Sequence, residues 1–130
     1  MPLTRIALRA GKPAEYRKAL ADGIQRSLVD TFNVPKDDMF MLITEHEPGN
    51  LIYDRHYLNI ERSDDFVVIQ LTVSNTRTLE QKKALYRRIV DELAESPGLR
   101  REDVFINLVE VEKENWSFGN GLCQYSRSSV

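Results

Sequence analysis

The chain has 130 residues, of which 42% are hydrophobic and 29% charged, and its formal net charge is -2. The chain has no excess of basic residues that would indicate nucleic-acid binding, and no apolar run of about 20 residues that would cross a membrane. Its single cysteine excludes an internal disulfide. Two histidines do not suggest a metal site and the first residues lack a signal peptide's apolar stretch, so we expect one cytoplasmic domain spanning residues 1–130.

The first half of the chain predicts a strand, a helix and a second strand. The short alternating run Leu3–Leu8 is typical of a strand, and Pro13 suits the first turn of a helix. Apolar residues then recur at helical spacing over Tyr16–Phe32. We expect this helix to end before Pro35, because proline disfavours a helical conformation at the preceding residue. The next strand is predicted at Met39–Thr44.

The second half predicts the same succession with clearer signals. Phe66–Val73 is rich in β-branched residues and apolar enough to be buried on both faces. Thr78 and Gln81 have the spacing of a capping box, which marks the start of the second helix. Pro97 ends that helix, and Val104–Val111 is the last predicted strand.

The two halves are related by an internal repeat with an offset of 65 positions. Within the two repeat units and without gaps, nine residues of the first are identical to their counterparts in the second: Glu15, Lys18, Ala19, Leu20, Ile24, Leu28, Asp38, Phe40 and Glu45. The units span about 2–46 and 67–111, and a helical crossover makes the two strands of each unit parallel. The predicted fold class is α+β: two tandem β-α-β units that form a four-stranded mixed sheet with both helices on one face.

This arrangement leaves one face of the sheet without a cover. Strands that are apolar on both sides would then expose a larger patch than a monomer tolerates, so we expect an oligomer that packs these faces together. Two stretches lie outside the repeat, Glu47–Asp65 and the tail from Glu112 onward. Such a tail can cover the sheet edge of a neighbouring chain.

A doubled strand–helix–strand chain that opens with Met1-Pro2 resembles the tautomerase superfamily, and within it the malonate semialdehyde decarboxylase branch. The resemblance covers nearly the whole chain. Its most specific segments are Pro2-Leu3, Val34-Pro35 with Asp38, Thr78–Lys82 and Asn115–Gly119. It implies a homotrimer, no cofactor, a small anionic oxo acid as substrate, and an active site around the Pro2 amine after Met1 is removed.

The resemblance also implies roles for four further residues and departs from the family at one. Asp38 matches the family's aspartate, and Arg77 matches one of its two substrate-binding arginines. The other arginine position holds Asn75, which is a departure, since the branch is basic at both places. Trp116 and Phe118 lie in the tail segment that carries the resemblance.

The repeat favours a chemical role for Pro2. Proline after the initiator methionine can simply begin a strand, where its missing N–H is tolerated. Its counterpart, however, is Val67, so the halves differ at the one position where a free amine can arise. Burial and a nearby cation would lower the pKa of such an amine, and a neutral amine can accept a proton from carbon.

Several candidate residues also have structural interpretations. Arg77 and its counterpart Lys12 are either solvated loop cations or anion-binding groups, and the role of Lys12 stays open. Asp38 either holds the amine cationic or activates a water, or, like its counterpart Asp103, it holds a turn. Trp116 and Phe118 could fix the tail, form an apolar wall of the pocket, or do both.

Three functions remain at this point. The first is a keto–enol tautomerase of a small 2-oxo acid, with neutral Pro2 moving the proton. The second is a decarboxylase or hydratase of a 3-oxo acid, with Pro2 cationic. The third is a trimeric module without catalysis, because a fold alone does not establish a function.

Overall fold

Each half of the chain folds into a strand, a helix and a second strand. The computed structural model describes residues 1–126. The first half forms β1 (Leu3–Arg9), α1 (Ala14–Phe32) and β2 (Met41–His46), and the second forms β3 (Val67–Ser74), α2 (Leu79–Glu95) and β4 (Val104–Val111). The helices begin at Ala14 and Leu79, which is the offset of the sequence repeat.

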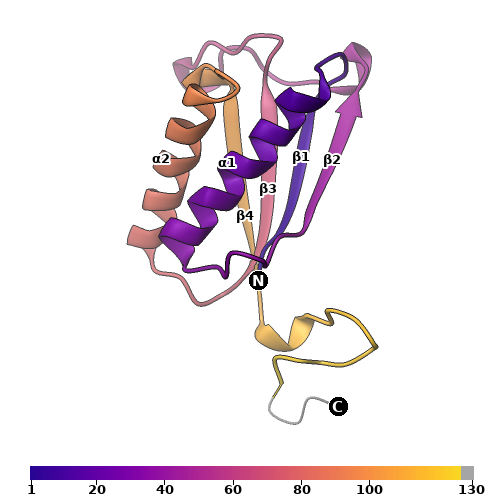
Figure 1. Ribbon diagram of the computed structural model, residues 1–130. Coiled ribbons are helices and arrows are strands. Elements are labelled where there is room, and N and C mark those ends of the chain that lie inside the picture. The colour runs from indigo at the N-terminus through magenta and orange to yellow at the C-terminus, as the bar shows by residue number, and fades with distance from the viewer. Residues whose placement is uncertain (127–130) are drawn as a thin grey trace.

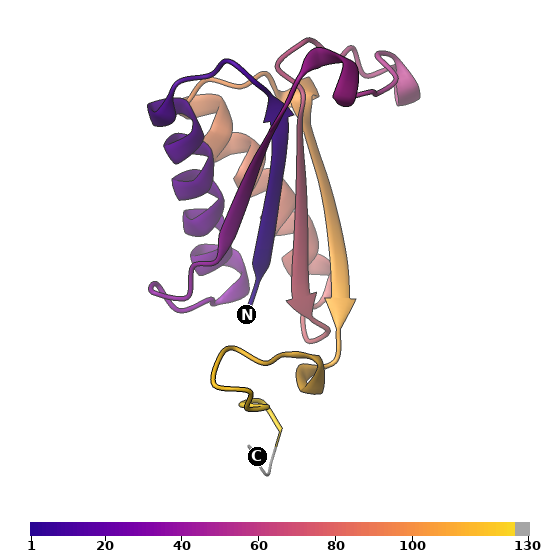
Figure 2. The same cartoon turned by 90° about the vertical axis from the view of Figure 1, so that its right-hand side faces the viewer.

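The strands form one mixed sheet in the order β2-β1-β3-β4. The two strands of each unit are parallel, as a helical crossover requires, and the units meet where β1 runs antiparallel to β3. Both helices lie on the same face of this sheet (Figures 1 and 2). The predicted α+β architecture is therefore confirmed.

The core lies between this sheet and its helices. On β1 and β3, every second side chain faces the helices and is buried, including Ile6 and Ile69, which are register partners. Fully buried leucine and isoleucine side chains contribute about 1.5–3 kcal/mol each. The helices pack closely at Gly23, where an added Cβ atom would lie 3.0 Å from Leu93 Cδ2.

The helix ends agree with the sequence, whereas one strand is displaced. Thr78 accepts a hydrogen bond from the backbone N–H of Gln81 and forms the predicted capping box, and α1 ends at Phe32, followed by Asn33 in a left-handed conformation. The second strand begins at Met41 rather than at the predicted Met39. Phe40 looks like a strand residue in the sequence, but it precedes β2 and its exposed ring lines a cavity.

The face of the sheet away from the helices is more polar than the sequence suggested. On β3, Val68, Gln70 and Thr72 point to this face and are half-buried, and Gln70 donates a hydrogen bond to Asn107 at 3.1 Å. The face still carries large exposed apolar side chains: Leu42, Phe105 and Val109.

The two segments outside the repeat lie at opposite ends of the sheet. The stretch between β2 and β3 folds over one end, where Tyr53 stacks on Phe66 with ring centroids 4.2 Å apart. The segment after β4 lies at the other end, beside the N-terminus (Figure 1). No helix in the described part of the chain is both long and apolar enough to span a bilayer.

Candidate active site

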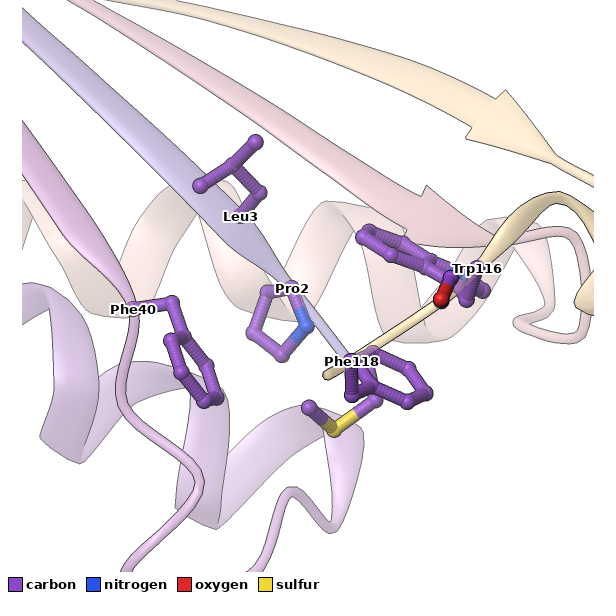
Figure 3. A pocket seen from close by; sticks show the side chains of 7 residues that line it. Pro2, Leu3, Phe40, Trp116 and Phe118 are labelled. Carbon is purple, nitrogen blue, oxygen red and sulfur yellow. The ribbon is translucent and has the colours of Figure 1, made fainter. Parts of the chain in front are cut away.

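Pro2 lies just before β1, buried between aromatic side chains from two distant parts of the chain. Figure 3 shows its ring between Phe40 and the pair formed by Trp116 and Phe118. These residues, with Met1, Leu3 and Ser117, line an apolar cavity of about 200 Å³. The residues that lead into β1 thus place Pro2 in an apolar pocket.

The aromatic wall is held by contacts within the tail and with β3. Trp116 stacks on Phe118 with ring centroids 5.5 Å apart, and its indole N–H donates to the Ser74 hydroxyl at 3.1 Å. Phe118 also makes an edge contact with Tyr125. Trp116 and Phe118 therefore do both things that the sequence left open: they make the contacts that fix the tail, and they line the apolar cavity.

A second, polar cavity of about 330 Å³ lies beside the N-terminus and is also lined by Met1. Its lining includes Asp38, Arg77, Lys113 and Tyr125. Met1 lines both cavities and therefore lies between them. Two cations, one carboxylate and the chain's N-terminus thus converge beside the apolar pocket.

Asp38 presents a buried carboxylate to this cavity. Its backbone is fixed, since its N–H donates to Pro35 and its carbonyl accepts a 3.0 Å hydrogen bond from the side-chain amide of Gln25. Neither carboxylate oxygen has a hydrogen-bond partner within residues 1–126. Burial raises the pKa of Asp38, while the N-terminal amine and Arg77 act in the opposite direction.

The repeat counterpart of Asp38 has a different environment. Both carboxylate oxygens of Asp103 are used, accepting hydrogen bonds from the N–H and the hydroxyl of Ser63 at 2.7 and 2.6 Å. Asp103 therefore holds a loop, as the structural interpretation of the pair required. The carboxylate of Asp38 has no such partner in the described chain, so Asp38 does not hold a loop in the way that Asp103 does.

Arg77 stands just before α2 with its guanidinium at the polar cavity. It donates to the carbonyl of Phe32 at 2.9 Å and lies over the Phe32 ring, 4.9 Å from its centroid. Burial lowers its pKa, opposed by Tyr125 and Asp38. Its counterpart Lys12 instead pairs with Asp65 at 2.7 Å, at the opposite end of the sheet. The repeat thus keeps a cation at both junctions but leaves only Arg77 beside the N-terminus.

Asn75 lines neither of these two cavities. Its side-chain amide donates to Glu112 at 2.9 Å. Lys113 and Tyr125 do line the polar cavity, and sequence reasoning missed both. The repeat could not reveal them, because the tail has no second copy with which to compare it.

These groups set the proton affinity of the N-terminal amine. In this structure the amine belongs to Met1, and burial lowers its pKa. Asp38 opposes that change, whereas Arg77 and Lys113 lower the pKa further. A neutral amine beside a cavity lined by two cations can exchange a proton with an organic anion that enters it. Within residues 1–126, no three His, Cys, Asp or Glu side chains are grouped as a metal site requires.

Comparisons with known proteins point to one family. Two family profiles, both described as tautomerase enzyme, match residues 2–59 and 38–119, and the second spans more than half of the chain. The chain is 43% identical to the probable tautomerase YusQ of Bacillus subtilis (strain 168), over 95% of this chain and 98% of that protein. A structure of malonate semialdehyde decarboxylase, described by its decarboxylase and hydratase activities, is 28% identical with a TM-score of 0.91 and 98% of each chain covered. A fused 4-OT symmetric trimer shares the fold at 19% identity and a TM-score of 0.77, over 92% of this chain and 94% of its own.

Proposed function

Because the chain belongs to the tautomerase superfamily, we propose that it is a keto–enol tautomerase of a small 2-oxo acid. Its base is the amine of Pro2, which becomes free when Met1 is removed. The reaction moves one proton between carbon and oxygen, so an amine and an anion site supply the groups that it needs without a cofactor. The substrate carboxylate binds at Arg77, which can donate two parallel hydrogen bonds to it.

The proton transfer follows from this placement. The neutral amine takes a proton from the carbon beside the substrate carbonyl. The C–H electron pair becomes the enol double bond, and the carbonyl π pair moves to oxygen. The Pro2 ammonium then returns the proton to that oxygen, and the reverse sequence converts enol to ketone. Trp116 and Phe118 exclude water, which favours the neutral form of the amine.

The environment of the N-terminal amine is the observation that carries this proposal. Burial, Arg77 and Lys113 lower the pKa of the Met1 amine, and a base must be neutral to accept a proton. Met1 lies between the apolar and polar cavities. We expect its removal to join them and to leave the Pro2 nitrogen at the junction, with aromatic side chains on one side and charged groups on the other.

Asp38 supports a second candidate function, a malonate semialdehyde decarboxylase-like or hydratase-like reaction with cationic Pro2. Its buried carboxylate raises the pKa of the amine and has no partner in the described chain. The 28% identical structure of malonate semialdehyde decarboxylase favours the same chemistry. The two candidates make opposite demands on Asp38, because a general base requires a low amine pKa and a cationic catalyst requires a high one.

Replacing Asp38 with asparagine is expected to separate the two candidates. Asp38 raises the pKa of the Met1 amine, so removing its charge should also lower the pKa of the Pro2 amine and move the acidic limb of kcat/KM for enol ketonisation to lower pH. Tautomerase activity at neutral pH should persist. The measurement is the pH profile of ketonisation, followed in parallel with the decarboxylation of a 3-oxo acid.

Asp37→Asn is the matched control, because it removes an exposed carboxylate at the neighbouring position. If Asp38→Asn abolishes ketonisation at every pH while Asp37→Asn does not, the neutral-base mechanism is wrong. Loss of 3-oxo acid turnover with the wild-type chain active on that substrate would instead support the decarboxylase.

The proposed assembly is a homotrimer formed through the sheet face away from the helices. Leu42 and Phe105 are 46% and 47% exposed on that face, and the fused 4-OT chain of the same fold is a trimer. Light scattering should give about three times the 15.0 kDa mass of one chain. Phe105→Glu should lower that mass by placing a charge in the interface. Leu79→Glu, which alters an exposed residue of α2, should not. A well-folded wild-type monomer at micromolar concentration contradicts the proposal.

A further inference from the structure

The polar cavity contains a second cation, Lys113, which forms no ion pair with a carboxylate of the described residues. Lys113 lines this cavity with Arg77, and its ammonium forms no ion pair or hydrogen bond with the described residues 1–126. In contrast, the ammonium groups of Lys12 and Lys82 are paired with Asp65 and Glu110 at 2.7 and 2.9 Å. Lys113 acts on the site electrostatically, since it lowers the pKa of the N-terminal amine.

The segment around Lys113 is held on both sides by hydrogen bonds with the last residue of β3 and with the residue that follows it. Lys113 begins a 3₁₀ turn, Lys113–Asn115. Before the turn, the backbone N–H of Asn75 donates to Val111 at 3.0 Å, and after it the indole of Trp116 donates to Ser74. The lysine therefore has a fixed attachment point beside Arg77, although its side chain is exposed.

Asn75 also forms a hydrogen bond with the carboxylate of Glu112, the residue that precedes Lys113. Its side-chain amide donates to Glu112 Oε1 at 2.9 Å. Glu112 is thereby directed to Asn75, and it forms no ion pair with the adjacent lysine. This hydrogen bond leaves the ammonium free to attract an external anion and links position 75 to the cavity without placing Asn75 in its lining.

We infer that Lys113 is a second anion-binding residue, which shares the substrate carboxylate with Arg77, and that Asn75 is its positioning residue. The inference deepens the proposed function and rests on it for the identity of the site. The guanidinium supplies directed hydrogen bonds and the ammonium supplies a compact charge. The site thus has two cations, but the second one comes from the tail rather than from position 75.

Binding of an unreactive carboxylate tests this inference without requiring turnover. The probe is 3-phenylpropanoate, whose ring suits the apolar cavity, and its neutral counterpart is 3-phenylpropanamide. Both are titrated calorimetrically into protein whose mass shows that Met1 has been removed. Lys113→Ala should weaken carboxylate binding about three- to tenfold and leave amide binding unchanged, because only the anion loses an electrostatic partner. Lys113→Arg should restore most of the affinity.

The control for general charge effects is Lys83→Ala, which removes an exposed lysine of α2 that lines neither cavity. It should leave the binding of both compounds unchanged. Equal carboxylate affinities for wild type and Lys113→Ala overturn the inference. So does the absence of saturable carboxylate binding to the wild-type chain.

The role of Asn75 is tested with a double-mutant cycle. Asn75→Ala alone should weaken carboxylate binding about two- to threefold, and it should have no further effect in the Lys113→Ala background. A purely structural defect would weaken the amide as well and would add to the effect of Lys113→Ala, which would contradict the positioning role. Charge-selective binding without any tautomerase activity would refute the proposed function alone, whereas activity without charge-selective binding would refute only this inference.

Discussion

Pro2→Ala is expected to lower kcat for ketonisation by about 10²–10⁴-fold, the usual contribution of a general acid–base group. The substitution replaces a secondary amine with a primary one and so changes its basicity and geometry at the reacting atom. The fold should be preserved, because Pro2 precedes β1 and alanine still permits removal of Met1. Steady-state kinetics on the variant, with circular dichroism and light scattering for fold and assembly, provide the measurement.

An N-terminal extension is the stricter version of this experiment. A verified additional residue before Pro2 places its nitrogen in an amide, which cannot act as a base at neutral pH. The extended chain should retain carboxylate binding at Arg77 but lose turnover more completely than Pro2→Ala. If a chain with a verified extension keeps full activity, Pro2 is not the catalyst and the proposed mechanism fails.

Arg77→Ala should raise KM for an anionic substrate about ten- to a hundredfold, because a hydrogen-bonded ion pair with the carboxylate is lost. The half-buried guanidinium also contacts Phe32, so the melting temperature must be recorded beside the kinetics. Arg77→Lys keeps the charge but loses the planar pair of donors, and it should give an intermediate KM.

Lys12→Ala provides a matched control, since Lys12 is the repeat counterpart of Arg77 and pairs with Asp65 at the other end of the sheet. It should change KM little. An unchanged kcat/KM in Arg77→Ala would show that this guanidinium is only a cation at the start of α2.

Local signals in the sequence were sufficient for the repeated part of the fold. The capping box of Thr78 and the 65-residue offset each have a direct physical meaning, and the structure contains both features. The start of β2 was predicted two residues early, because an apolar residue such as Phe40 has the same appearance in a strand and in a cavity lining. The spacing of apolar residues in a sequence indicates which side chains are buried, but it does not indicate which other residues they pack against.

The candidate site was only partly predictable. Comparison of the halves singled out Pro2, and the structure separates Asp38 from Asp103 by the hydrogen bonds of Ser63. Lys113 reaches the cavity through a tail with no internal counterpart, so no pattern in the sequence could place it. The catalytic and substrate-binding roles of these residues stay predictions until the variants are measured.

The pairing of two β-α-β units in one polypeptide has a stoichiometric consequence. A chain has a single α-amino group, so joining two units end to end halves the number of terminal amines that they can offer. In the second unit, the position of Pro2 is taken by Val67, which is a buried residue of β3. Lys12, the counterpart of Arg77, is paired with Asp65. A mechanism-based inactivator that alkylates the terminal nitrogen should therefore add once per chain, that is, once for every two units.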